Sequence, residues 1–92
     1  SAIESITMRK AGTIVTSNPT PVRDFIVNDL HRSATMEQAE GAYTHDEKWV
    51  LTTVLTRGQA QKLRLYVRGL DDHAFITIVN SSEIVGKGFR AI

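Results

Sequence analysis

The sequence has no cysteine, two prolines among 92 residues and an aromatic content of only 7%. Without cysteine, disulfides, thiolate zinc sites and cysteine nucleophiles are all excluded. The longest apolar stretch, residues 74–79, is far shorter than the ~20 residues that a membrane-spanning helix needs. We therefore expect the chain itself to be soluble.

An excess of charge of either sign is also missing. The sequence has 11 basic and 10 acidic residues, which gives a formal net charge of +1. So small a charge creates no long-range field that would attract nucleic acid or an anionic membrane. We therefore expect recognition to be local, and we expect no nucleic-acid partner.

What is present is the composition of an ordinary globular domain. Hydrophobic residues make up 41% of the chain and charged residues 23%, which is close to the averages of folded proteins. A chain of 92 residues can build one hydrophobic core but not two. We assign residues 1–10 to a lead-in segment and residues 11–92 to a single domain.

Four stretches have the β-branched or apolar pattern of strands. They are residues 11–17, 35–43, 49–56 and 74–79. The polar residues 44–47 predict a hairpin between the second and third of these strands. Residues 84–89 predict either a further short strand at the edge of the sheet or a tail.

Two more stretches have the pattern of amphipathic helices. In the first, Thr20 and Pro21 suit the N-cap and the first helical position, and apolar residues share one face as far as His31. In the second, Thr56 and Gln59 have the spacing of a capping box. Gly69 stands where a left-handed residue commonly ends a helix.

The order strand, helix, strand, strand, helix, strand predicts an α+β fold. It is the ferredoxin-like βαββαβ sandwich, with two helices on one face of a four-stranded antiparallel sheet. The other face is then open, and the strand at 49–56 is apolar on both of its faces, so we expect a second copy or a neighbouring domain to cover it. The predicted interface residues are Trp49, Val50, Leu51 and Val54.

The polar residues predict neither a catalytic nor a metal site. The three histidines have no nucleophile motif around them. Residues 45–47 and 71–73 place His beside Asp or Glu, and we interpret both as polar turns because adjacent residues seldom bind one ion together. Glu37 and Glu40 would face opposite ways on a strand. We expect no enzymatic activity and no cofactor.

Residues 86–90, Gly-Lys-Gly-Phe-Arg, are a candidate for ligand contact. Two glycines permit close approach of the backbone, and Lys87 and Arg90 could neutralise an anion. The alternative is a bulged strand with Phe89 packed in the core. Lys87-Gly88-Phe89 is also a fragment of an RNA-binding motif, but it follows the last strand instead of lying in a central one.

Four segments in order resemble a known module: 24–35, 41–44 (Gly-Ala-Tyr-Thr), 71–76 (Asp-Asp-His-Ala-Phe-Ile) and 85–89 (Val-Gly-Lys-Gly-Phe). They are similar to the C-terminal cytoplasmic domain of YitT-type bacterial multi-pass membrane proteins, a ferredoxin-like domain of unknown function. The likeness covers the chain from about Ala11 onward. The family usually has glycine at two positions where this chain has Ser33 and His45.

The resemblance implies a non-catalytic regulatory or ligand-sensing domain at the cytoplasmic face of the membrane, attached to a membrane region. The fold is also similar to that of PII-type signalling proteins, trimers that bind nucleotides between subunits, so we predict a homo-oligomer and a small anionic or nucleotide ligand. The alternative is a structural oligomerisation module. The predicted ligand-binding residues are Arg32, Thr35, Gly41, Tyr43, Gly86, Lys87, Gly88 and Phe89.

Overall fold

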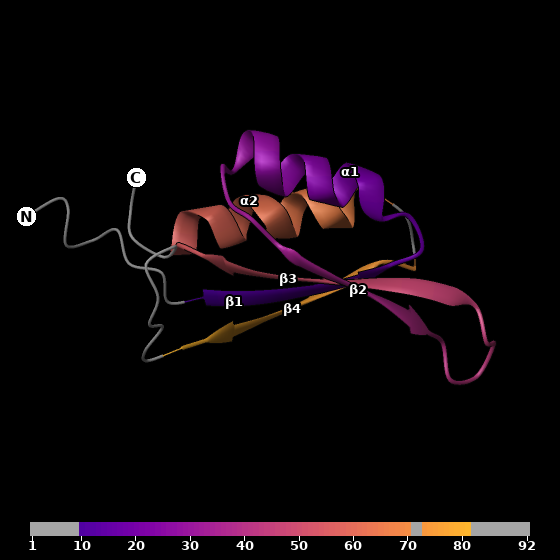
Figure 1. Ribbon diagram of the computed structural model, residues 1–92. Helices are drawn as coiled ribbons and strands as arrows, with labels where there is room; N and C mark the ends of the chain where they lie inside the picture. Colours follow the sequence, from indigo (N-terminus) through magenta and orange to yellow (C-terminus); the bar gives the residue numbers. More distant parts are fainter. Residues whose placement is uncertain (1–9, 71–72, 82–92) are drawn as a thin grey trace, which may run out of the picture.

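The computed structural model describes residues 10–70 and 73–81. In these residues a four-stranded antiparallel sheet carries its helices on one face (Figure 1). The elements are β1 (Lys10–Thr16), α1 (Pro19–Asp24), η2 (Phe25–Asp29), β2 (Thr35–Glu40), β3 (Glu47–Leu55), α2 (Arg57–Arg68) and β4 (Phe75–Asn80). The strand order β2-β3-β1-β4 confirms the predicted ferredoxin-like arrangement. The predicted strand at 84–89 lies outside the described residues.

Alternate residues of the two central strands build the core. Ile14 of β1 lies opposite Leu51 of β3, and neither side chain retains exposed surface. The helices cover this face with apolar residues that recur every three or four positions. The buried apolar residues are Ile14, Val22, Ile26, Leu30, Leu51, Leu55, Ala60, Leu63 and Val67.

The first helix differs from its prediction at its start and in the form of its second half, and it ends close to the predicted His31. It begins at Pro19 with Asn18 as the N-cap, two residues before the predicted start. It continues past Asp24 as a π-helix, in which the backbone N–H of Leu30 donates to the carbonyl of Phe25 at 3.1 Å. Ile26 and Leu30, four residues apart, both lie on the buried face.

The second helix follows its prediction at the start and departs from it at the end. The Thr56 hydroxyl accepts from the Gln59 N–H, and the Gln59 side chain accepts from the Thr56 N–H, so the capping box is confirmed. Gly69, however, has a right-handed φ of −86°. The prediction of a left-handed residue there is wrong, because its N–H continues the helical bonding to the Tyr66 carbonyl.

One aromatic pair joins the two helices. The rings of Phe25 and Tyr66 are stacked, with centroids 4.1 Å apart and planes 9° apart. The Tyr66 hydroxyl also donates to the Pro21 carbonyl at 3.3 Å. The side of α2 that carries Tyr66 therefore faces the first helix.

Candidate functional site

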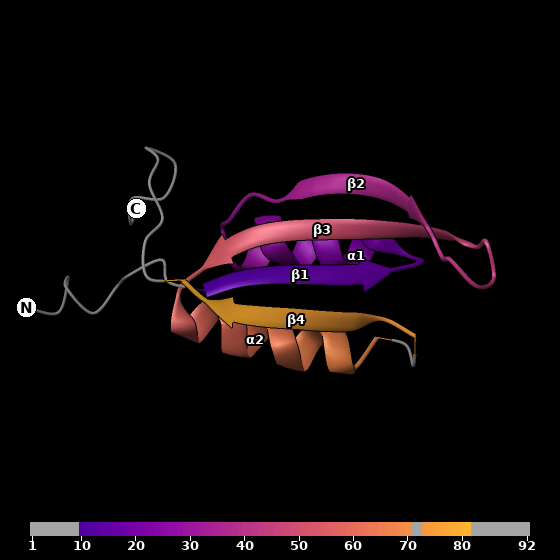
Figure 2. The same cartoon turned by 90° about the horizontal axis from the view of Figure 1, so that it is seen from below.

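The first candidate region is the sheet face opposite the helices, which Figure 2 shows from the front. We call it the open face. In its two apolar rows Val15 lies opposite both Val50 and Phe75, and Ala11 lies opposite both Val54 and Val79. Phe75 is 55% exposed and Val79 52% exposed, while the three central valines are half-buried.

A row of threonines separates the two apolar rows. Thr77, Thr13, Thr52 and Thr35 are successive register partners across all four strands. Their side chains are short and β-branched, which suits a pleated surface and leaves it level. The centre of the open face is therefore an uncharged surface of small residues. The ring of Phe75 lies at its β4 edge, and the charged side chains of Glu37 on β2 and Lys48 on β3 lie at its border.

The four predicted interface residues do not share this face. Trp49 and Leu51 lie on the helix side of β3, where Leu51 has no exposed surface and Trp49 packs partly against the core. Only Val50 and Val54 of the predicted set lie on the open face. The prediction was wrong because this strand is apolar on both faces. Hydrophobicity therefore does not show which face the helices cover.

The β2–β3 hairpin forms the second candidate region. Its turn is closed by two backbone bonds of 2.8 Å, from Gly41 N–H to the Asp46 carbonyl and from His45 N–H to the Gly41 carbonyl. A side chain at position 41 would meet Thr44 Oγ1 at 3.2 Å, so glycine keeps the turn tight. Tyr43 at the tip is 95% exposed.

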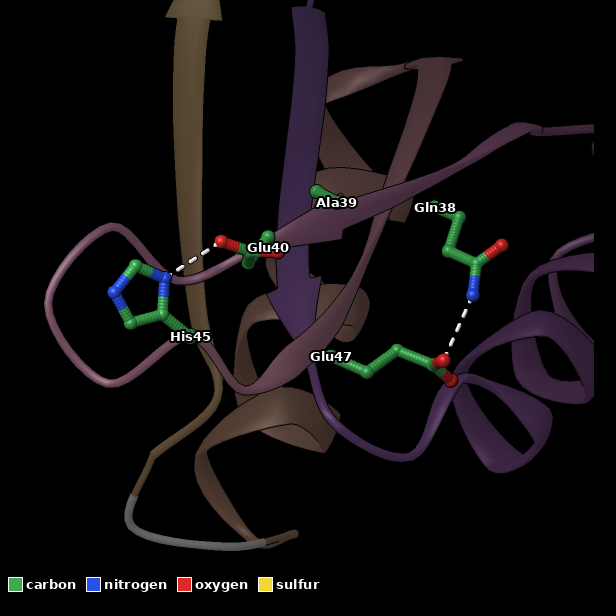
Figure 3. A pocket seen from close by; sticks show the side chains of 5 residues that line it. All are labelled: Gln38, Ala39, Glu40, His45 and Glu47. Atoms are coloured by element: carbon green, nitrogen blue, oxygen red, sulfur yellow. Dashed lines mark hydrogen bonds and ion pairs between the residues drawn. The ribbon is translucent and has the colours of Figure 1, made fainter.

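A hollow of about 500 Å³ lies beside this turn (Figure 3). His45 Nδ1 lies 2.7 Å from Glu40 Oε2, and Gln38 Nε2 donates to Glu47 Oε2 at 2.7 Å. The second oxygen of Glu47 accepts from the Trp49 indole N–H at 3.3 Å. Because two carboxylates line the hollow, it suits a cationic or neutral polar group better than a phosphate.

Arg32 and Thr35 lie at the opposite end of β2 from this hairpin. Arg32 Nε donates to the Val54 carbonyl at 3.0 Å, beyond the last β2–β3 pair, Thr35 with Thr52. Six strand residues separate the two regions, which is about 17 Å along the strand. The structure therefore does not bring Arg32 and Thr35 together with Gly41 and Tyr43, and the predicted residues 86–89 lie outside the described residues.

The two positions where the family usually has glycine behave differently. His45 has a φ of 63°, in the left-handed region that glycine adopts without strain. Ser33 has no such constraint, and its carbonyl accepts a 2.7 Å hydrogen bond from Thr53 Oγ1. Serine therefore replaces glycine at 33 without backbone strain, whereas histidine at 45 is strained and compensated in part by Glu40.

The histidines do not meet in one place. His31 follows the first helix with a left-handed φ of 56° and is exposed, and His45 pairs with Glu40. His73 is exposed just before β4. Within residues 10–70 and 73–81, no group of three His, Asp or Glu side chains is placed to hold a metal ion.

Comparison with known proteins supplies the family. Residues 32–86, more than half of the chain, match the family described as "Uncharacterized protein conserved in bacteria (DUF2179)". The chain belongs to the DUF2179 family. The resemblance to a domain of YitT-type membrane proteins is thereby confirmed, since the curated relatives include YitT itself.

The curated relatives of this DUF2179 chain are mostly membrane proteins. UPF0750 membrane proteins YvjA and YitT of Bacillus subtilis are 30% and 31% identical to it over 88% and 92% of its length. An uncharacterized protein in the cccA 5' region of Bacillus sp. (strain PS3) is 35% identical over 88% of this chain and 54% of its own length. The chain spans about half of that relative and 29% and 30% of YvjA and YitT.

Two solved structures share the fold. A DUF2179 protein from Eubacterium ventriosum is 25% identical, with a TM-score of 0.58 over 77% of this chain and 99% of that one. A functionally unknown protein from Pediococcus pentosaceus has a TM-score of 0.67 at 8% identity, over 87% of this chain and 99% of its own, a likeness of fold alone. In the part of this chain that the structure describes, neither helix is long and apolar enough to cross a bilayer.

Sequence reasoning missed the threonine row and the hollow beside the hairpin. The signal for the row was present, because Thr52, Thr13 and Thr77 each lie inside a strand and Thr35 begins one. Their alignment depends on the register of three strand pairs, which the sequence does not state. The hollow depends on Glu40 and Glu47 being register partners across the hairpin.

Proposed function

We propose that this DUF2179 domain is a non-catalytic regulatory part of a bacterial membrane protein, and that it joins copies of that protein across the open face of its sheet. The observation that carries the proposal is the composition of that face. It is apolar and free of charge along its two central strands from Ala11 to Val15 and from Val50 to Val54. A contiguous apolar surface of this kind commonly marks a protein–protein contact.

A second copy is the simplest occupant, because a level surface of small β-branched side chains can pack against its own copy. Two sheets pack face to face about 10 Å apart, with the inward side chains of both interdigitated. The threonine hydroxyls fit such a contact, since each can donate to a hydroxyl of the facing sheet. The membrane context comes from the relatives, which are named as membrane proteins and are about three times as long as the match.

The regulatory role follows from this arrangement. A domain that associates weakly in solution associates far more strongly when each copy is attached to a subunit in the same membrane, because attachment raises its effective concentration. Any event that changes the association of the domains then changes the arrangement of the attached subunits. We place this domain on the cytoplasmic side, as the resemblance to YitT-type proteins implies.

Sedimentation velocity over a micromolar concentration series tests the contact. Val50→Glu introduces a charge at the centre of the open face and is expected to yield a monomer at every concentration, while the wild-type chain shifts to a dimer or a higher oligomer. Asn28→Asp on the exposed side of η2 adds the same charge away from the face and should leave association unchanged. A wild-type chain that stays monomeric at high micromolar concentration would exclude the proposal.

The hairpin supports a second function, the sensing of a small ligand. Tyr43 is almost fully exposed at the tip of the hairpin, and an aromatic ring there can stack on a planar ligand. A thermal-shift screen of nucleotides, small anions and polyamines tests this function. A ligand at 100 times its Kd stabilises a domain by about 2.7 kcal/mol, and Tyr43→Ala should remove that shift. If no compound class raises the unfolding temperature, the sensing function is excluded and assembly remains the proposed function.

A further inference from the structure

The helix α2 carries only positive charge, although the chain as a whole is nearly neutral. The helix carries Arg57, Lys62, Arg64 and Arg68 and no acidic residue. All four side chains are exposed. Residues 57, 61, 64 and 68 recur at spacings of four, three and four, so they form one stripe along the helix. We call Arg57, Arg64 and Arg68 the arginine stripe.

The arginine stripe lies on the outer flank of the domain. Tyr66 contacts the first helix, and a rotation of 100° per residue places residues 57, 64 and 68 about 160° or more around the axis from it. Figures 1 and 2 show α2 along the β4 edge of the sheet, with α1 on the β3 side. The stripe therefore points away from α1, and Leu65, 56% exposed, lies next to it.

Few partners are available to these arginines inside the domain. Arg64 donates to Gln61 within the stripe itself. The neighbouring strand β4, Phe75–Asn80, contains no charged residue. Asp71 and Asp72 follow α2 in the sequence and lie outside the described residues. The statement that α2 carries no acidic residue refers to residues 57–68 alone. Exposed arginines beside an exposed leucine form a surface that suits phosphate groups at an apolar boundary.

We propose that the arginine stripe docks this domain on the anionic headgroups of a lipid bilayer. Charge complementarity supports this occupant, because the guanidinium group binds phosphate oxygens in a bidentate manner. The membrane context supports it independently, since relatives that contain the matching domain are named as membrane proteins. The inference does not rest on assembly through the open face, which is on the other side of the sheet and stays free when α2 touches lipid.

The docking is weak for the free chain and effective for an attached one. Each arginine near an anionic surface strengthens binding about five-fold, which corresponds to about 1 kcal/mol. The stripe alone therefore gives partition coefficients that need millimolar lipid in solution. A domain attached to a membrane protein is always exposed to lipid at such concentrations. It therefore exchanges between an orientation in which α2 contacts the bilayer and one in which it does not.

Vesicle co-sedimentation of this chain tests the inference. The vesicles are rich in phosphatidylglycerol or consist of phosphatidylcholine alone, and the lipid concentration is raised into the millimolar range at low and at high salt. We expect binding to the anionic vesicles only, and its loss at high salt. Arg64→Gln combined with Arg68→Gln should lower the partition coefficient about twenty-five-fold, from the same five-fold factor for each arginine.

The control variant removes the same charge elsewhere. Arg23→Gln with Lys48→Gln neutralises one residue on α1 and one on the open face, and it should retain most of the binding. Equal losses in the two double variants would mean that net charge and not the stripe governs binding, which would overturn the inference. Absence of binding to anionic vesicles at millimolar lipid would overturn it as well. Circular dichroism of both variants checks that each is folded.

Discussion

The two faces of the sheet use the same four strands in different ways. On the helix side Ile14, Leu51 and Leu55 are completely buried, and the two polar residues buried there are threonines. On the open face Val15, Val50 and Val54 alternate with those residues and are half-buried by their neighbours alone. The helix side is fully used for stability, whereas the open face is apolar beyond what the isolated domain needs. Its composition is therefore best explained by a contact outside the domain.

We expect the largest difference in unfolding free energy from substitutions at two adjacent residues of β3, one on each face. Leu51→Ala creates a cavity under the helices and should reduce the free energy of unfolding by about 2 to 5 kcal/mol. Val50→Ala on the open face should cost less than about 1 kcal/mol in the monomer. Urea unfolding, followed by the fluorescence of the single tryptophan Trp49, measures both. Equal costs for the two would mean that the faces do not differ in the way described.

A substitution of Arg32 tests whether a side chain from outside the sheet stabilises the end of β3. Its Nε donates to the carbonyl of Val54 where β3 extends past its β2 partner. Arg32→Met removes a charged donor from a part-buried bond, so we expect a loss of about 1.5 to 3 kcal/mol. Arg23→Met, in which an exposed arginine beside Asp24 is changed, is the matched control and should be nearly neutral. A neutral Arg32→Met would show that this bond does not stabilise the end of β3.

Two adjacent threonines give a smaller contrast. Thr53 is buried on the helix side, and its hydroxyl donates to the Ser33 carbonyl at 2.7 Å. Thr53→Val should cost about 1 kcal/mol, because it leaves that carbonyl without its donor. Thr52→Val, in the exposed threonine row, should leave the monomer unchanged and weaken self-association, because it removes a hydroxyl from the proposed contact. Urea unfolding and sedimentation velocity together measure the pair, and a destabilised Thr52→Val would contradict the contrast.

The smallest effects concern the two left-handed histidines, one after the first helix and one in the hairpin. His31→Gly relieves the positive φ and should stabilise the domain by about 0.5 to 1 kcal/mol. His45→Gly relieves the same strain but also removes the contact with Glu40, so its gain should be smaller. Thermal unfolding of both variants at neutral pH gives the comparison. A loss of stability in His31→Gly would show that the imidazole has a role beyond its backbone position.

The sequence predicted the order of elements because local patterns are enough for it. The capping box at Thr56 and Gln59 and the apolar period of α2 are determined by residues close together in the chain. The boundaries were less certain: β2 ends at Glu40 instead of Tyr43, because the turn bonds of Gly41 and Asp46 end the ladder there. The π-turn after Asp24 had no recognisable sequence signal.

The candidate site was predicted less well than the fold. The sequence identified Tyr43 and Gly41 as unusual, and both lie in the hairpin beside the hollow. It could not show that Arg32 lies at the far end of β2, since distance across a sheet depends on strand length and register. It also attributed Trp49 and Leu51 to the open face, because hydrophobicity alone does not say which face of a strand the helices cover.

The sequence by itself determined the class of this domain: one core, two amphipathic helices, alternating strands and the DUF2179 family. These properties depend on residues a few positions apart, for which helical and strand periods are sufficient. Only the tertiary structure decided which residues share a surface. The threonine row, the arginine stripe on the outer flank and the separation of Arg32 from Tyr43 all result from register and packing between distant segments.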